Sequence, residues 1–181
     1  MKEEYVGILL IVCAALFMIM GMMNKNNSFI DLNNIISNHL KLFEKSKKQY
    51  LNFYLYPLIM SIGVAFLYSA DAMMYQNIIV VISIFISMLF AILSILITKD
   101  YSKYEGDKQE RIKRVLKETN NAIVFCVFIC IIIMIISMIM LALESMKCDL
   151  ANKVISTIVF YLIQVLMLNM LLIIKRMGKL I

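Results

Sequence analysis

The chain has 181 residues, of which 62% are apolar and 17% are charged, and its formal net charge is +6. Soluble globular domains are about 45–50% apolar and about 25% charged, so a chain of this composition has too few polar residues to cover its surface in water. Its mean hydropathy of +0.87 agrees with that deficit. The composition therefore excludes a soluble globular protein and predicts a membrane protein.

Charged residues divide the chain into segments, and five charge-free segments are long enough to cross a bilayer. A transmembrane helix needs about 20 mainly apolar residues. The longest segment between two of them has no room for an independent domain, which needs about 50 residues. We therefore predict one all-α, polytopic transmembrane domain over residues 1–181. Its five predicted spans are residues 5–24, 49–70, 72–98, 119–143 and 154–174.

Lysine and arginine residues gather in the segments 25–48, 99–118 and 175–181, which contain fifteen of the eighteen in the chain. Five spans put these three segments on the same side of the membrane. Basic residues are concentrated in the cytoplasmic loops of membrane proteins. We therefore expect a multi-pass protein of the inner (plasma) membrane with its N-terminus outside and its C-terminus in the cytoplasm.

The cytoplasmic segment 25–48 has the pattern of an amphipathic helix. Ser28 begins a capping-box-like sequence. Apolar residues then recur at helical spacing, and no glycine or proline separates them from the second span, so we expect one helix that can continue into that span. A helix resting on anionic lipid and a ligand-sensing or gating element both fit this pattern. The apolar positions are Leu32, Ile35, Ile36, Leu40 and Phe43.

The second span contains the only proline of the chain, Pro57. Proline removes one backbone hydrogen bond and predicts a kink. With Gly63 it is a candidate hinge between the amphipathic helix and the membrane bundle, and a kink that serves only packing is the alternative. The turn after this span is short, which predicts a tight antiparallel hairpin of the second and third spans.

The spans carry no charged residue and no histidine, but two of them carry a set of small or weakly polar residues. The serines of the third span share one helix face, and an amide lies at the midpoint of the fifth span. An amide that faces lipid at mid-membrane is unfavourable, so we expect it to face protein or water. A pore wall or subunit seam is one interpretation, and packing within one chain is the other. The candidates are Ser83, Ser87 and Ser94 in the third span and Ser156, Thr157 and Gln164 in the fifth.

The segment 105–118 is the second cytoplasmic element, and we expect a short helix that leads into the fourth span. Ile112, Val115 and Leu116 form an apolar stripe, and Glu110 and Arg114 are spaced as a favourable helical ion pair. A charged connector without helical structure is the alternative.

The sequence indicates no catalytic, cofactor-binding or metal site, and we expect no enzymatic activity. It has a single histidine, His39, and four cysteines without a C-x-x-C pair. It also lacks the G-x-S-x-G, H-E-x-x-H and phosphate-loop motifs. Ion-coupled transporters usually carry charged groups near the midplane of their spans, so the absence of such groups disfavours that class.

Three stretches resemble small bacterial membrane proteins of anti-phage systems, in particular the Hailong-type channel effector. They are residues 53–58 (Phe-Tyr-Leu-Tyr-Pro-Leu), 117–121 (Lys-Glu-Thr-Asn-Asn) and 171–177 (Leu-Leu-Ile-Ile-Lys-Arg-Met), with Gly63 between the first two. The resemblance implies a homo-oligomeric ion channel that depolarises the host cell. It also implies a partner nucleotidyltransferase whose DNA oligomers hold the channel shut.

The excess of basic residues on the inner side fits either a membrane surface or a bound polyanion. With the resemblance added, the expected regulator is an oligonucleotide or nucleotide. The candidate residues for its binding are Lys45, Lys47, Lys48, Arg111 and Arg114.

Three functional classes remain open from the sequence. A regulated channel or pore effector, with a role in antiviral defence, is the favoured hypothesis. A non-catalytic membrane scaffold or holin-like subunit is the first alternative. A small transporter or a membrane enzyme is the second.

Labelling from the outside tests the predicted topology. Cys148 lies between the fourth and fifth predicted spans, and it is expected to react with a membrane-impermeant thiol reagent in intact spheroplasts. A Cys148→Ser variant is the control for the site of labelling. A fluorescent protein fused to the C-terminus is expected to fluoresce in the cytoplasm, and a periplasmic C-terminus would contradict the orientation.

Overall fold

The computed structural model describes Gly7, Cys13 and residues 32–40, 47–68, 70–98, 106–143 and 149–178. All regular structure in this part of the chain is helical, as predicted. The predicted span 5–24, apart from Gly7 and Cys13, lies outside the described residues. The helices are α2 (Leu32–Leu40), α3 (Lys47–Leu67), α4 (Ala72–Thr98), α5 (Asp107–Ala142) and α6 (Asp149–Met177).

Four of these helices are long and apolar enough to cross a membrane, which supports a multi-pass membrane protein. The membrane-capable parts overlap the last four predicted spans, and those of α5 and α6 extend beyond the charged residues that bounded the predicted spans 119–143 and 154–174. They are Tyr50–Leu67 in α3, Ala72–Thr98 in α4, Gln109–Ala142 in α5 and Leu150–Met177 in α6.

Much of the apolar surface faces outward, as expected for a chain whose solvent is lipid. The side chains of Phe66 and Leu67 are 78% and 90% exposed, and Ile97 is 75% exposed. Such a surface would be an aggregation hazard in water, because soluble monomers rarely expose large contiguous apolar patches. The buried core is correspondingly narrow and lies along α5, where Ile123 and Ile133 have no exposed surface.

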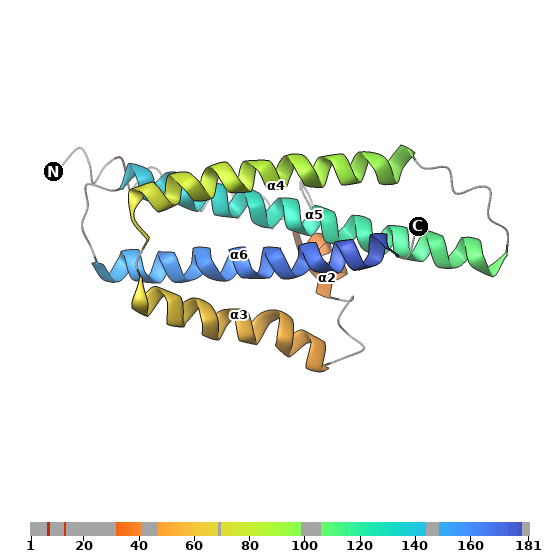
Figure 1. Cartoon of the computed structure of the whole chain (residues 1–181), viewed down its shortest axis with the longest axis horizontal. Coiled ribbons are helices and arrows are strands. Elements are labelled where there is room, and N and C mark those ends of the chain that lie inside the picture. The colour runs from red at the N-terminus through yellow and green to blue at the C-terminus, as the bar shows by residue number, and fades with distance from the viewer. Residues whose placement is uncertain are drawn as a thin grey trace.

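Helix α5 is the centre of the arrangement, because it packs against α4, α6 and α2. Helix α3 packs against α6. Figure 1 shows the consequence: α3 and α4 lie on opposite sides of α6, although a short turn joins them. The prediction that the second and third spans pack against each other as a hairpin is therefore wrong. The turn is short, but α6 separates the two helices along their lengths.

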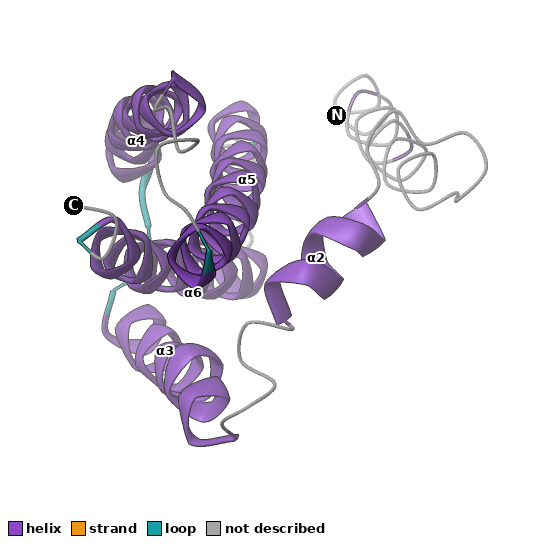
Figure 2. Ribbon diagram, turned by 90° about the vertical axis from the view of Figure 1, so that its right-hand side faces the viewer, coloured by secondary structure: helices purple, strands orange, loops and turns teal. Residues whose placement is uncertain are grey.

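The expected continuation of the amphipathic helix into the second span is also wrong. Helix α2 ends at Leu40 and α3 begins at Lys47, and Figure 2 shows the two helices running in different directions. The reason is that they have different partners, since α2 packs against α5 and α3 against α6. One straight helix could not reach both.

Helix α5 is much longer than a bilayer requires. Its 36 residues correspond to about 54 Å at 1.5 Å per residue, against about 30 Å of hydrocarbon core. It begins after Gly106, whose φ of +63° suits glycine, and it continues unbroken from 107 into the fourth span. The helix expected within 105–118 is thus the first part of α5, and Figure 1 shows this end extending beyond the neighbouring helices.

Candidate functional site

Four residues from three parts of the chain form a hydrogen-bonded contact, here called the turn clamp, where α3, α4 and α6 meet. The backbone N–H of Ala70 donates to Ser156 Oγ at 3.2 Å, and Asn152 Nδ2 donates to the Ala70 carbonyl at 3.0 Å. The hydroxyl of Tyr75 lies 3.1 Å from Ser156 Oγ and 3.2 Å from Asn152 Oδ1. The first turns of α6 therefore satisfy both backbone groups of Ala70, in the turn between α3 and α4.

The turn clamp explains why α3 and α4 do not pack as a hairpin. Because the polar groups of residue 70 bind α6, the N-terminal end of α6 lies between the two helices. Ser156, a candidate pore residue, is buried here and forms contacts within one chain. The buried position of Ser156 fits a role in interhelical hydrogen bonding better than a role in a pore wall that water reaches.

The three serine candidates of α4 lie on an exposed face of that helix, here called the α4 stripe (Ser83, Ser87 and Ser94). The opposite face, with Ile82 and Leu89, is buried. Ser83 Oγ donates to the Val80 carbonyl at 2.7 Å, and Ser87 Oγ donates to the Ser83 carbonyl at 3.1 Å. Two hydroxyls of the stripe are thus satisfied by their own helix and do not require a polar neighbour.

Gln164 and Thr157 are half-buried on α6. Thr157 Oγ1 donates to the Lys153 carbonyl at 2.8 Å, so its helix satisfies it. Within the described part of the chain, the amide of Gln164 makes no hydrogen bond. An amide at the middle of a membrane-capable helix is costly to leave unpaired in lipid. Among the candidates, Gln164 is therefore the residue whose amide needs a hydrogen-bond partner from water or from a second copy of the chain.

A second amide of α6, Asn169, is not among the site residues predicted from the sequence. Its side chain is fully buried, and its Nδ2 donates to the Val165 carbonyl at 2.8 Å. Its Oδ1 is buried without a hydrogen-bond partner among the described residues. Asn169 follows Gln164 by five residues, which puts the two amides on different sides of the helix, and the sequence alone could not tell which side faces the core.

The two groups of candidate pore residues do not meet within one chain. Helix α4 packs against α5, whereas α6 packs against α3 and α5. The α4 stripe is exposed and faces away from the core, and Gln164 lies on α6, which does not pack along α4. A continuous polar path cannot be assembled from these residues in a single subunit.

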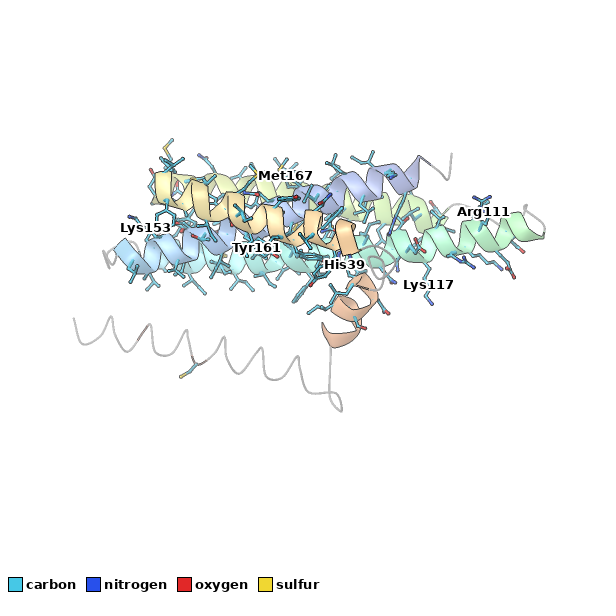
Figure 3. The ribbon with its side chains drawn as sticks, turned by 90° about the horizontal axis from the view of Figure 1, so that it is seen from below. His39, Arg111, Lys117, Lys153, Tyr161 and Met167 are labelled. Atoms are coloured by element: carbon cyan, nitrogen blue, oxygen red, sulfur yellow. The ribbon has the colours of Figure 1, made fainter. Side chains whose placement is uncertain are left out.

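The candidate regulatory cations are also divided. Arg111 and Arg114 are exposed on the extended first part of α5, and Figure 3 shows Arg111 near the tip of that helix. Lys47 and Lys48 occupy the first turn of α3, and Lys45 lies outside the described residues. Figure 1 shows the beginnings of α3 and α5 apart along the long axis, so Lys47 and Lys48 do not lie beside Arg111 and Arg114.

The two candidate hinge residues, Pro57 and Gly63, differ in how far they are buried. Pro57 is buried, and α3 continues through it to Leu67. Gly63 is exposed, and a Cβ added there would have no atom within 4 Å. Close packing therefore does not account for the glycine at position 63.

A contact that the sequence analysis did not single out lies on α2. The ring of His39 is fully buried and stacks on Phe125 of α5, with ring centroids 3.7 Å apart and planes inclined by 8°. Nearby, Arg176 of α6 donates to the Glu118 carbonyl at 2.9 Å and lies 3.7 Å from the Glu118 carboxylate. The available signal was the spacing of Ile35 and His39, which puts both on one face of α2.

No group of three potential metal ligands occurs among the described residues. Cys126 and Cys130 are buried one turn apart on α5, consistent with small core residues. No known protein family matches the chain, and neither a curated protein nor a solved structure is detectably similar to it.

Two serine variants test the turn clamp. Ser156→Ala leaves the buried N–H of Ala70 without an acceptor, which costs about 1–3 kcal/mol. Ser87→Ala removes a hydroxyl that bonds only to its own helix on an exposed face, so its cost is expected below about 0.5 kcal/mol. Reversible unfolding in mixed detergent micelles measures both. Equal losses would contradict the structural role of the clamp.

Proposed function

We propose that the chain is a subunit of a homo-oligomeric, regulated ion channel that depolarises the membrane in which it lies. By its sequence resemblance, its setting is bacterial anti-phage defence. The basic inner side, with the first turns of α5, faces the cytoplasm in this proposal.

The observation that carries the proposal is the unpaired amide of Gln164. It lies at the middle of a membrane-capable helix, is half-buried and has no hydrogen bond among the described residues. Water in a pore or a polar group of a second copy would satisfy it, whereas lipid would not. Because the described part of one chain supplies neither, an assembly of several copies is the simplest source of both.

An assembly through two different faces suits a ring. Contacts that use the same face on both partners close at two copies, whereas contacts between two different faces generate rings or filaments. The α4 stripe and the α6 face with Gln164 are two such faces. We propose that the α4 stripe of one copy lies against α6 of the next, with the small serines permitting close approach.

Regulation by a polyanion is proposed for the extended end of α5. Arg111 and Arg114 are exposed there, and a ring of subunits would repeat them around the cytoplasmic mouth. Repetition of positive charge in this way raises the local potential for a nucleotide or oligonucleotide. Lys45, Lys47 and Lys48 are the remaining candidates for the same ligand.

One observation favours a second candidate function, a non-catalytic scaffold or holin-like subunit. The hydroxyls of Ser83 and Ser87 bond within α4, so the α4 stripe is also compatible with lipid or with a partner helix. A scaffold would use the same surfaces without conducting ions. Ion flux therefore separates the two functions.

Flux through liposomes tests the channel proposal. The purified chain is expected to dissipate an ion gradient, and Gln164→Leu is expected to lower the flux at least tenfold because it removes the mid-membrane amide. Gln164→Asn, which keeps an amide, is the matched control and should retain more flux. Added DNA oligomers should lower the flux of the parent protein more than that of an Arg111→Gln/Arg114→Gln variant. Absence of flux from all of them would favour the scaffold.

Mass measurement in mild detergent or nanodiscs tests the assembly. The parent protein is expected at a multiple of 20.9 kDa. Leucines at Ser83, Ser87 and Ser94 should weaken association about tenfold or more, because bulky side chains keep helices apart. Leucines at the neighbouring exposed positions Val81, Ile84 and Met88 are the control. A monomer that still conducts ions would refute the assembly.

A further inference from the structure

Helix α2 is attached to the bundle by a small contact that depends on His39. This helix of nine residues packs against α5. Ile35 contacts the apolar core, and His39 stacks on Phe125 of α5. Ile36 and Leu40, which the sequence pattern assigned to the apolar face, are 39% and 38% exposed. Among the side chains of α2 that the structure describes, His39 is the one that is fully buried.

The surroundings of His39 oppose a positive charge on the imidazole. Arg176 of α6 acts on it as a like charge, and its guanidinium side chain is only 12% exposed. From α5, Phe125 supplies an apolar ring, and the carboxylate of Glu118 is already close to Arg176. Figure 3 shows His39 at the junction of α2 with the bundle.

Asn169 adds a polar group at the same level. The contact between Arg176 and Glu118 sets the register of the antiparallel helices α5 and α6. Phe125 follows Glu118 by seven residues, and Asn169 precedes Arg176 by seven. Equal rise along the two helices therefore puts Asn169 and Phe125 at one height. The α2 contact thus lies at the same part of the α5–α6 seam as Asn169, about one to two turns from the contact between Arg176 and Glu118.

We propose that α2 is a proton-operated latch, which docks on α5 while His39 is neutral and detaches when His39 takes up a proton. The four long helices stay assembled, because their mutual contacts and the turn clamp do not involve α2. This inference does not rest on ion conduction and applies equally to a scaffold.

The direction of the effect follows from linkage. Burial and then the charge of Arg176 lower the pKa of His39 from 6.5 to about 4. Detached α2 binds the proton at the ordinary pKa, so protonation favours detachment. Docking is strongest above pH 6.5 and weakens as the pH falls toward 4. Two-state linkage with these values lowers the docking constant about 20-fold between pH 7 and pH 5.

One titration reads the latch directly, because His39 is the only histidine. The probe is the full-length protein labelled with ¹⁵N-histidine and reconstituted in nanodiscs. The imidazole signals are expected to titrate with a midpoint below 6.5. Amide exchange of residues 32–40, corrected for the intrinsic effect of pH, should rise over the same range, while residues 122–134 stay protected. A pKa near 6.5, or titration without exposure of 32–40, would overturn the proposal.

Three variants separate protonation from general damage. His39→Phe keeps a ring for stacking but cannot take up a proton, so residues 32–40 should stay protected from pH 7 to pH 5. Ser37→Ala, at an exposed position of the same helix, should keep the parental response. Arg176→Gln should raise the midpoint of the His39 titration, which keeps the proposal testable if His39→Phe fails to dock. The same pH response in His39→Phe as in the parent, or an unchanged midpoint in Arg176→Gln, would refute the latch.

Discussion

The position of α6 between α3 and α4 depends on hydrogen bonds to one short turn. Ala70 in this turn is buried, so water does not reach its backbone groups, and they must find partners in the protein. Asn152 and Ser156 provide those partners for Ala70. Once they do, α3 cannot fold back on α4, and α5 becomes the helix that joins α4 to α6. The arrangement in which α6 lies between α3 and α4 thus depends on the hydrogen bonds of Asn152 and Ser156 to the N–H and carbonyl of Ala70.

The two ends of the bundle are held by different kinds of contact. At the turn clamp, neutral groups on α6 bind backbone atoms, and no proton or ion pair is involved. At the other end, Arg176 and Glu118 join α6 to α5, and α2 adds a contact through an imidazole. Charged and titratable groups respond to pH and to anions, whereas neutral hydrogen bonds do so much less. Any conformational response of this chain is therefore expected at the end that carries α2.

The four described long helices could be predicted from the sequence because each contains a long charge-free segment, although α5 begins twelve residues before its predicted span, at Asp107. Their packing could not, since a charge-free segment says nothing about which neighbour it meets. The short turn suggested a hairpin, but the acceptor for Ala70 is 86 residues away along the chain, at Ser156. Helical wheels grouped Ser156 with Gln164, yet one is buried and the other half-buried. The buried contact of His39 could not be predicted, because a single histidine on an amphipathic segment has no motif around it.

The separation of polar groups within one chain limits how such a chain can make a pore. Gln164 and the α4 stripe are on helices that both pack on α5 rather than along each other, and the stripe faces outward, so one copy does not enclose water between them. In the proposed ring, the α4 stripe packs against α6 of the next copy, so Gln164 would meet water at the edge of that seam. The hydroxyls of Ser83 and Ser87 are already satisfied within α4, whereas the amide of Gln164 is not. Water at that edge would stabilise Gln164 more than the two serines, so the proposed path runs along α6, beside its seam with α4 of the next copy.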